Sequence, residues 1–284
     1  MTDSPAPDLE AHKLACSEVW GGNRATDELV DVDGISALVH SRTYAGDESG
    51  GDLYYVSTCG SGRVSRFALA DVSGHGKPVS ELAIWLRNQM RRNVHQLNVA
   101  RLAVELNREL SAKDSEGRFA TALLATYFAP RDHLVICNAG HPRPLWRQAS
   151  SGAWKLLDHR EPSRAGELLN LPLGVIVPTD YHQFAIRLEP DDLVLLYTDA
   201  FIEVEVSPGQ RLGEAGFMEL VASIEPDEPR AFAQAIIDAF LAAYGEPEDD
   251  QTLLVLRHTA TDPEMGMMMR ALAPVARMLG IVDY

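Results

Sequence analysis

The chain has 284 residues, of which 46% are hydrophobic, and it carries a formal net charge of −16. A chain of this length can bury a large core, either as one domain with additions or as two small domains. The acidic balance argues against nucleic acid or an anionic membrane as the main partner, because both would be repelled. A phosphorylated substrate would be repelled as well, unless bound divalent cations reversed the local sign of the charge.

The cysteines and the N-terminal residues indicate the cellular compartment in which the protein is expected. Cys16, Cys59 and Cys137 are far apart and form no Cys-x-x-Cys pair, which favours a reduced protein with buried thiols. The first residues lack the basic region and apolar core of a signal peptide. No apolar run approaches the roughly 20 residues that span a bilayer. We therefore expect a cytoplasmic protein with neither a membrane nor a nucleic acid as partner.

The first half of the chain alternates between strand and helix patterns. Residues 1–14 are expected to form a mobile tail. Short strands are predicted at 17–20 and 36–44, around a polar loop that contains the acidic residues 27–33, and a hairpin is predicted from 53–58 and 63–70. The apolar periodicity then predicts a helix over 78–94. Asn98 is the predicted N-cap of a second helix with Leu102, Leu106 and Leu110 facing inward.

The second half is richer in strands. They are predicted at 120–128, 134–138, 154–157, 182–188, 193–198 and 252–257, with helices at 214–224 and 230–244 before the last of them. Runs of antiparallel-type strands interrupted by helix pairs favour an α+β fold over a βαβ sheet.

The last residues, 259–284, are expected to form a helical extension. Met267, Ala271, Val275 and Met278 fall on one face at helical spacing. The plainer interpretation is a helix that docks on the domain's own surface. The alternative is that this methionine-rich face binds a regulator or a second copy of the chain as a homodimer, since methionine adapts to varied surfaces.

Four aspartates lie in turn-like contexts, each at the start or end of a predicted strand. Asp52 follows Gly50-Gly51, Asp71 opens the segment Asp71-Val72-Ser73-Gly74-His75-Gly76, Asp199 ends an apolar run, and Asp249 precedes the final strand. Glycine or a second polar residue lets the backbone bend at these points. If the strand ends converge, the carboxylates form an all-oxygen site that suits magnesium or manganese.

Three further segments join these four: Phe119-Ala120-Thr121, Asn138-Ala139-Gly140-His141-Pro142 and Leu171-Pro172-Leu173-Gly174. Together they resemble the metal-dependent protein phosphatases (the PPM superfamily), in particular the bacterial branch typified by the stage II sporulation serine/threonine phosphatase. The likeness covers residues 44–257. It implies a phosphatase domain at residues 15–258, built as an antiparallel β-sandwich with helices packed on both outer faces (αββα layers).

The resemblance also implies roles for individual residues. The implied metal ligands are Asp52, Asp71, the backbone carbonyl of Val72, Asp199 and Asp249. Asp71 would bridge two manganese or magnesium ions, and Asp52 would hold either one metal or its water. Of the two adjacent acids, Asp249 matches the ligand, with Asp250 and Thr252 as its support.

Three more positions bear on the chemistry. Asp52, Asp71 and His75 are the candidate catalytic residues, and His75 could protonate a leaving alkoxide. His141 is expected to be a turn residue packed near the site. Ala200 stands where the family usually has glycine after the aspartate, and alanine tolerates a positive φ poorly.

The implied function is a Mn- or Mg-dependent phosphoprotein phosphatase that hydrolyses phosphoserine or phosphothreonine with a dimetal-activated water. Its substrate would be a small phosphorylated regulatory protein of a partner-switching signalling pathway. Two alternatives stay open. One is a catalytically silent binding or regulatory module of the same fold, which Ala200 favours. The other is a nucleotide cyclase, in which an acidic residue follows Gly-Gly-Asp; here Leu53 follows.

Overall fold

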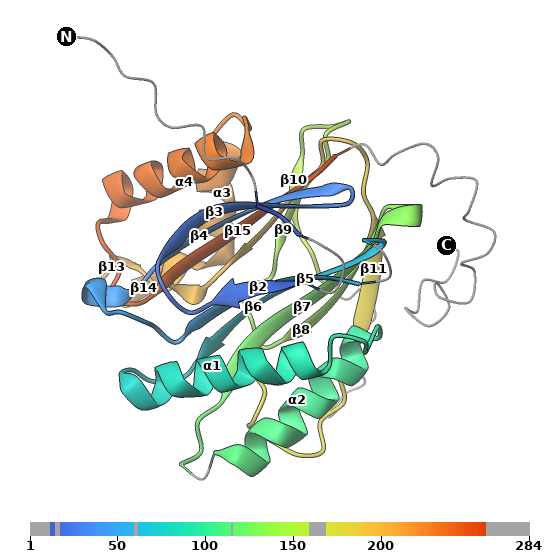
Figure 1. Cartoon of the computed structure of the whole chain (residues 1–284). Helices are drawn as coiled ribbons and strands as arrows, with labels where there is room; N and C mark the ends of the chain where they lie inside the picture. The colour runs from blue at the N-terminus through green and yellow to red at the C-terminus, as the bar shows by residue number, and fades with distance from the viewer. Residues whose placement is uncertain (1–11, 15–17, 60–61, 115, 159–168, 260–284) are drawn as a thin grey trace.

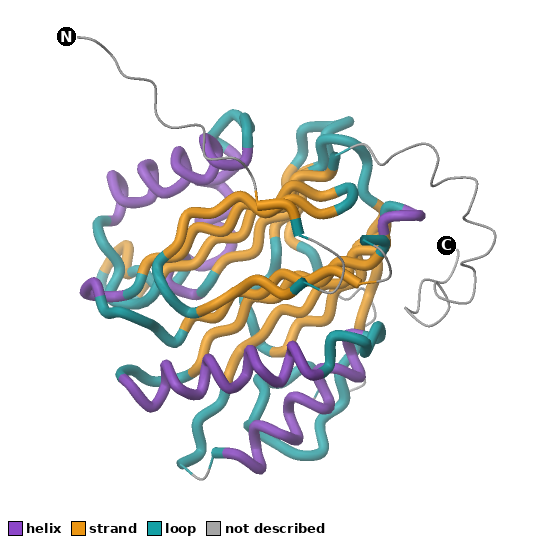
Figure 2. Tube along the Cα trace, in the orientation of Figure 1, coloured by secondary structure: helices purple, strands orange, loops and turns teal. Residues whose placement is uncertain are grey.

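Two large β-sheets pack face to face, and a pair of helices covers the outer face of each (Figures 1 and 2). The computed structural model describes residues 12–14, 18–59, 62–114, 116–158 and 169–259. Its layers are those of the predicted αββα sandwich. The expected C-terminal helix falls on residues outside the described part of the chain.

The six-stranded sheet carries the hairpin that was predicted around residue 60. Its strands are β2 (Val19–Gly22), β5 (Asp52–Cys59), β6 (Val64–Val72), β7 (Ala120–Phe128), β8 (His133–Ala139) and β11 (Gln183–Arg187). They are ordered β11-β8-β7-β6-β5-β2, and every neighbouring pair is antiparallel.

The seven-stranded sheet is built from both ends of the chain. Its strands are β1 (His12–Lys13), β3 (Thr26–Val32), β4 (Ile35–Arg42), β9 (Leu145–Arg147), β10 (Trp154–Leu156), β12 (Leu193–Tyr197) and β15 (Gln251–His258). Their order is β1-β3-β4-β15-β12-β9-β10, and β1 alone pairs in parallel, with β3. A separate small hairpin joins β13 (Glu205–Ser207) to β14 (Gln210–Arg211).

Helices cover the two outer faces in pairs. The helices α1 (Lys77–Arg92) and α2 (Val99–Lys113) lie on the six-stranded sheet, and α3 (Gly213–Ala222) and α4 (Pro229–Tyr244) lie on the other (Figure 1). The Asn98 side chain accepts a hydrogen bond from the Arg101 amide at 2.8 Å and caps α2 as predicted. Among the described residues, no helix has the length and apolar character needed to cross a membrane.

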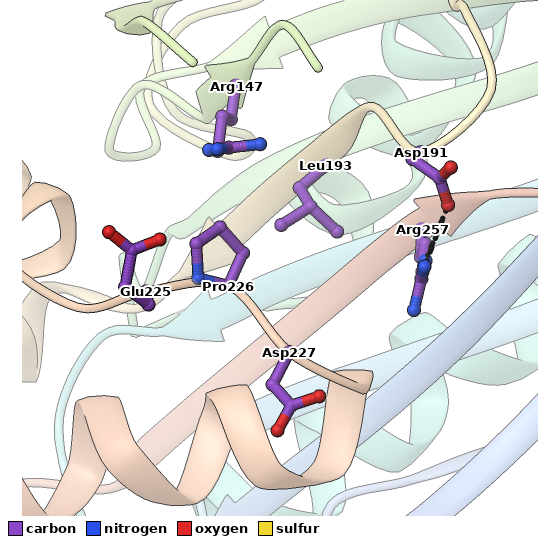
Figure 3. A pocket seen from close by; sticks show the side chains of 7 residues that line it. All are labelled: Arg147, Asp191, Leu193, Glu225, Pro226, Asp227 and Arg257. Carbon is purple, nitrogen blue, oxygen red and sulfur yellow. Dashed lines mark hydrogen bonds and ion pairs between the residues drawn. The ribbon is translucent and has the colours of Figure 1, made fainter.

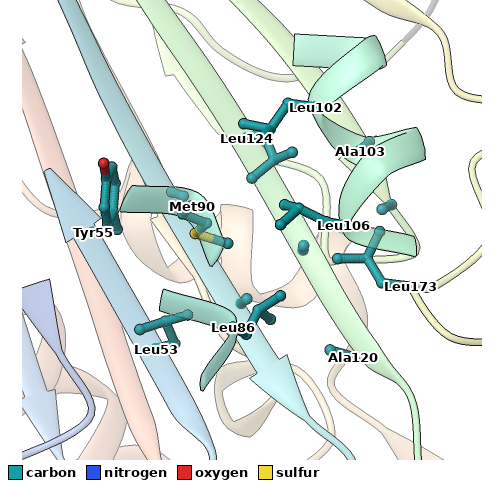
Figure 4. Packing of buried hydrophobic residues seen from close by; sticks show 14 of the residues in the cluster. Leu53, Tyr55, Leu86, Met90, Leu102, Ala103, Leu106, Ala120, Leu124 and Leu173 are labelled. Atoms are coloured by element: carbon teal, nitrogen blue, oxygen red, sulfur yellow. The ribbon is translucent and has the colours of Figure 1, made fainter. Parts of the chain in front are cut away.

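The buried side chains form three layers, because successive residues of a strand point to opposite faces. On the outer side of the six-stranded sheet, Leu53 packs with Leu86 of α1 and Leu106 of α2 (Figure 4). The layer between the sheets contains Leu69 of β6 and Leu254 of β15. By the same alternation, Asp52, Asp71, Thr198 and Thr252 continue the inward-facing rows at one edge of the sandwich. The fold therefore delivers polar groups from both sheets to one rim.

The prediction of a loop that contains residues 27–33 is wrong. Residues 26–32 form β3, which pairs antiparallel with β4 through a turn at Gly34, where φ is 76°. Val30 is fully buried between the sheets, whereas Asp27 and Glu28 are exposed. The acidic side chains suggested a solvated loop, but they lie on a strand that buries alternate apolar residues.

The sequence patterns also missed three short strands, β9, β13 and β14. β9 fills the gap between β12 and β10 by pairing Leu145 with Leu195 and with Leu156. Segments of two or three residues offer too little periodicity for a strand to be predicted. At the N-terminus, residues 12–13 of the expected tail pair with β3, while residues 1–11 lie outside the described part.

Candidate metal centre

Asp52 and Asp71 are cross-strand partners at the open end of the β5–β6 hairpin. Such partners share a face of the sheet, with Cβ atoms about 4.5–5.5 Å apart. Asp52 is only 3% exposed. Burial and the Asp71 charge raise the pKa of Asp52 well above its usual range. The pair therefore concentrates negative charge in a place with little water.

Two threonines from the opposite sheet hold Asp52. The Thr198 hydroxyl donates to Asp52 Oδ2 at 3.0 Å and accepts from the Thr252 amide at 3.0 Å. Hydrogen bonds from the side chains of Thr252 and Thr198 act against burial and lower the pKa of Asp52. Thr252 was expected to support Asp249, but the structure places it beside Asp52, and the role of Thr198 was not predicted.

Asp199 and Asp249 approach the same rim on neighbouring strands of the seven-stranded sheet. β12 ends two residues before Asp199 and β15 begins two residues after Asp249, and these strands are antiparallel. Burial, followed by the charges of Asp199 and Asp249, raises the pKa of Asp71 to about 8. Burial and the Asp249 charge raise the pKa of Asp199 to about 6, and burial raises the pKa of Asp249. The four predicted aspartates thus form one electrostatically coupled group.

Glu203 belongs to the same acidic group and was not predicted. Its charge raises the pKa values of Asp71, Asp199 and Asp249. The Glu203 amide donates to the Asp199 carbonyl at 2.8 Å, so the turn that positions Asp199 also positions Glu203. No sequence motif marks this residue, since its placement depends on the fold of that turn.

The structure separates the roles of the two adjacent acids. Asp250 Oδ2 accepts a hydrogen bond from the Gly51 amide at 2.6 Å, and Oδ1 accepts from the Tyr44 amide at 2.7 Å. Both carboxylate oxygens of Asp250 are therefore engaged in fixing loops beside the site. A Cβ added at Gly50 would lie 2.1 Å from Asp250 Oδ2, so the approach requires glycine there. Asp250 is a positioning residue, which favours Asp249 as the ligand.

Asn23 is a second positioning residue that sequence patterns did not identify. Its side-chain amide donates to the Gly50 carbonyl at 2.9 Å and to the Ser80 hydroxyl at 3.0 Å, and its own backbone carbonyl accepts from the Gly50 amide at 2.8 Å. Asn23 is buried and ties the Gly50 loop to the first turn of α1. The sequence indicated only that Asn23 lies in the polar loop after the first predicted strand.

The turn after Asp71 is fixed from two sides. A Cβ on Gly51 would lie 3.0 Å from the Val72 carbonyl oxygen, the predicted backbone ligand. The Ser73 amide donates to the Phe119 carbonyl at 2.9 Å, and the Phe119 amide donates to the Ser73 hydroxyl at 3.0 Å. The motif around Phe119 therefore supports the turn that presents the Val72 carbonyl.

Ala200 fits the site without strain. It lies in the short 3₁₀ helix Asp199–Phe201, and it is not one of the described residues with a positive φ. The expected conflict between alanine and a left-handed turn does not arise.

The two candidate histidines differ sharply. His75 is exposed on the turn after Asp71. His141 is buried, and its Nδ1 lies 2.8 Å from the Thr121 hydroxyl, whose residue is the cross-strand partner of Asp71. Burial lowers the pKa of His141 to about 3, so it is neutral. His141 is therefore a packed turn residue near the site, as predicted.

The residues present fit hard divalent cations. The charges that act on Asp71 and Asp199 come from other acidic side chains. A bound cation would relieve the mutual repulsion of these carboxylates. Within the described residues, no three His, Cys, Asp or Glu side chains are placed to hold a metal ion by themselves. Magnesium commonly takes one or two carboxylates and keeps several waters, so a direct all-protein cage is not required.

Two cavities meet at this rim. One, of about 440 Å³, is lined by Ala200, Val204, Pro247 and the acids Glu203, Glu205, Glu246, Glu248 and Asp249. The other, of about 360 Å³, is lined by Arg42, residues 43–46, Glu246, Pro247, Asp249 and Gln251. A third pocket, which includes Arg147 and Arg257, lies at the opposite ends of β12 and β15 (Figure 3). It is thus separate from the carboxylate group.

Comparison with known proteins gives a family match over residues 61–259, to the family described as stage II sporulation protein E (SpoIIE). Two curated relatives from Bacillus subtilis (strain 168) also match. The phosphoserine phosphatase RsbP is 29% identical over 190 residues, which cover 65% of this chain and 44% of RsbP. The phosphoserine phosphatase RsbU is 25% identical over 237 residues, which cover 81% of this chain and 64% of RsbU. The chain therefore spans less than two thirds of either relative.

Solved structures share the fold. A crystal structure of the RsbU and RsbW domains of a Mycobacterium tuberculosis protein matches with a TM-score of 0.69 and 24% identity, over 88% of this chain and 69% of that one. A crystal structure of RsbX in complex with magnesium matches with a TM-score of 0.60 and 16% identity, over 82% of this chain and 100% of that one. These matches support the predicted sandwich architecture.

Proposed function

Because the chain belongs to the SpoIIE family, a bacterial branch of the PPM phosphatases, we propose that it is a metal-dependent phosphatase of phosphoserine and phosphothreonine in proteins. The observation that carries the proposal is the coupled group of Asp52, Asp71, Asp199 and Asp249 at one rim of the sandwich. Asp52 is buried, Asp71 and Asp199 are half-buried and Asp249 is exposed. Such a concentration of neighbouring carboxylates is unfavourable by itself and is typical of a functional site.

The proposed metals are two manganese or magnesium ions. Asp71, the Val72 carbonyl, Asp199 and Asp249 would hold them, with Asp52 as a further ligand. When bound, the ions would supply the positive charge that a phosphate needs here and would lower the pKa of a water molecule toward neutrality. Oxygen ligands favour these hard cations over zinc.

The chain's own residues prepare the site for hydrolysis. Thr198 fixes the Asp52 carboxylate, so that Asp52 can orient the attacking water. Asp250 and Asn23 hold the Gly50–Asp52 loop in place. His75 is exposed on the neighbouring turn, and in this proposal it would donate a proton to the leaving alkoxide. No cysteine nucleophile is involved.

The proposed substrate is a small phosphorylated regulatory protein of a partner-switching pathway in the cytoplasm. Support comes from the two phosphoserine phosphatases RsbP and RsbU, which match this chain at modest identity. The alternative is a catalytically silent module of the same fold. Ala200 was the feature that favoured this alternative. It lies in a short 3₁₀ helix and has no positive φ, so the strain expected at this position is absent.

The decisive test is release of phosphate from a phosphoserine peptide by the purified chain. We expect turnover with manganese or magnesium, none with chelator, and recovery when the metal is restored. Asp71→Asn is the variant that tests the metal centre, since it removes one charge and keeps the side-chain shape. Equal turnover by Asp71→Asn at saturating manganese would exclude the proposed centre. A well-folded wild-type chain that binds the peptide without hydrolysing it would favour the silent module.

A further inference from the structure

The cavity that contains Arg42 lies beside the proposed centre but is distinct from it. It is lined by Asp249, yet by none of Asp52, Asp71 and Asp199. Arg42 ends β4 and is the register partner of Gln251, which begins β15 two residues after Asp249. The cavity therefore adjoins the metal-binding rim at a place where residues next to a phosphorylated side chain would lie.

The two cavities at this rim differ in charge. Both are lined by Glu246, Pro247 and Asp249. The larger one adds only acidic charges, those of Glu203, Glu205 and Glu248. Among the described residues that line either cavity, Arg42 is the one cationic side chain. The larger cavity thus offers an incoming anionic group no counter-charge, whereas the other offers one guanidinium beside Glu246 and Asp249.

The guanidinium of Arg42 is available to a new partner. Its nearest ion-pair partner is Glu246, at 3.8 Å, and the two side chains are 47% and 69% exposed. An exposed pair of this kind is worth about 0–1 kcal/mol, so exchanging Glu246 for another carboxylate costs little. A guanidinium also matches a carboxylate in a two-point, fork-like arrangement.

The rest of the cavity provides a fixed wall. The Tyr44 amide donates to Asp250 Oδ1 at 2.7 Å, which ties the 3₁₀ turn Tyr44–Gly46 to the loop that supports the centre. The Tyr44 side chain itself is 49% exposed. A turn fixed in this way, with an exposed aromatic ring and an exchangeable guanidinium, can contact a short stretch of bound polypeptide.

We propose that this cavity is a specificity subsite for an aspartate or glutamate side chain that flanks the phosphorylated residue of the protein substrate, with Arg42 as its counter-charge. The inference rests on the proposed phosphatase function and names a chemical feature of its substrate. The phosphoryl group itself would lie at the cations that Asp71 would hold, outside this cavity.

The test uses phosphoserine peptides that differ only in one flanking residue, which is Asp, Ala or Lys at successive positions. We expect wild-type kcat/KM to favour Asp over Ala at one position by about fivefold, in line with an exposed charge pair. Arg42→Ala should bring that ratio close to one, and Arg42→Glu should favour Lys. Glu246→Gln, which frees Arg42, should strengthen the preference for Asp. Arg108→Ala is the matched control, because Arg108 pairs with Glu105 on the surface of α2 and should leave the ratio unchanged.

The outcomes separate this proposal from the phosphatase function. Absence of turnover on every peptide would count against the function, and binding of the same fluorescently labelled peptides would still report the Asp preference. Turnover without any flanking preference, or a preference that persists in Arg42→Ala, would overturn the subsite. If Arg42→Ala lowers kcat/KM by the same factor for every peptide and for p-nitrophenyl phosphate, the subsite is also overturned, because Arg42 would then serve the phosphoryl group.

Discussion

Asp52 and Asp71 stand directly opposite one another on adjacent antiparallel strands, with both carboxylates turned toward the space between the two sheets. Like charges in this arrangement destabilise a sheet. The Asp71 charge accordingly raises the pKa of Asp52, and Asp199 and Asp249 act on Asp71 in the same way. The metal-free fold therefore carries a strain that protons or cations relieve, and its pH dependence follows.

The first prediction concerns the metal-free protein. The pKa of Asp71 is about 8 in the folded state against 3.8 without the fold. Between these values the folded chain holds a proton that the unfolded chain has released, so stability falls as pH rises through this window. Asp71→Asn has no such proton. In chelator at pH 8 its Tm should exceed that of the wild type by about 3 °C or more, because each kcal/mol is worth roughly 2–4 °C at this size.

The comparison must be repeated near pH 4, where the folded wild type keeps Asp71 protonated and the difference in Tm should disappear. A constant difference across the whole range would mean that the asparagine side chain of the Asp71→Asn variant stabilises by packing. An unfolded variant at pH 8 would contradict the repulsion argument directly.

The second prediction concerns proton release on metal binding. Asp71, with a pKa of about 8, retains its proton in the metal-free chain at pH 7, whereas Asp199, with a pKa of about 6, has largely lost its proton at that pH. Because cations displace bound protons, manganese affinity should rise with pH between 6 and 8. Calorimetry in two buffers of different ionisation enthalpy should show about one proton released per chain at pH 7. Asp71→Asn should release much less. Binding that is independent of pH would rule out Asp71 as a ligand.

The third prediction compares two neighbouring glycines. A Cβ at position 50 meets Asp250 Oδ2 at 2.1 Å, whereas one at position 51 meets the Val72 carbonyl oxygen at 3.0 Å. Asp250 cannot retreat without losing its bonds to the amides of Gly51 and Tyr44. Gly50→Ala should therefore lower the free energy of unfolding by about 2 kcal/mol or more, weaken manganese binding and reduce turnover. Gly51→Ala should have the smaller effect in urea unfolding and in the metal titration; the reverse order would show that Asp250 does not fix this loop.

The fourth prediction concerns the cysteines. Burial raises the pKa of the Cys137 thiol to about 12, so a thiolate is unavailable there at neutral pH. Replacing Cys16, Cys59 and Cys137 with alanine should preserve manganese-dependent turnover, apart from a modest loss of packing. Iodoacetamide should leave the wild type active, whereas chelator should abolish activity. Inactivation by the alkylating reagent together with resistance to chelator would point to a cysteine-dependent phosphatase instead.

The sequence predicted those parts of the site that depend on local chemistry. Asp71 was identifiable because its carboxylate opens a glycine-rich turn between a strand and a helix. The resemblance assigned Asp250 a supporting role but could not name its partners, because the amides of Gly51 and Tyr44 are about 200 residues away in the chain and meet it only in the folded sheet. Glu203 and Asn23 are similar cases, since ordinary turn residues acquire their roles through tertiary contacts.

The last prediction separates positioning from packing with two buried threonines. The Thr198 hydroxyl donates to Asp52 and accepts from the Thr252 amide, both at 3.0 Å. Thr198→Val keeps the shape but leaves a buried carboxylate and a buried amide without this partner, which costs about 1–3 kcal/mol. The hydrogen bond from Thr198 lowers the pKa of Asp52, so the loss of this bond should raise that pKa further. We expect turnover to fall about tenfold or more, as for the loss of a hydrogen-bond partner of a carboxylate at a metal site, with a shift of the pH–rate profile to higher pH.

Thr126→Val is the matched control. Thr126 is equally buried in β7, its hydroxyl has no hydrogen-bond partner among the described residues, and it faces the helices α1 and α2, away from the site. Removing an unsatisfied buried hydroxyl is neutral or stabilising. The Thr126→Val variant should thus match or exceed the wild type in urea unfolding and keep its pH–rate profile. If both variants lose activity equally with unshifted profiles, Thr198 contributes only to packing, and Asp52 does not depend on it for its place in the site.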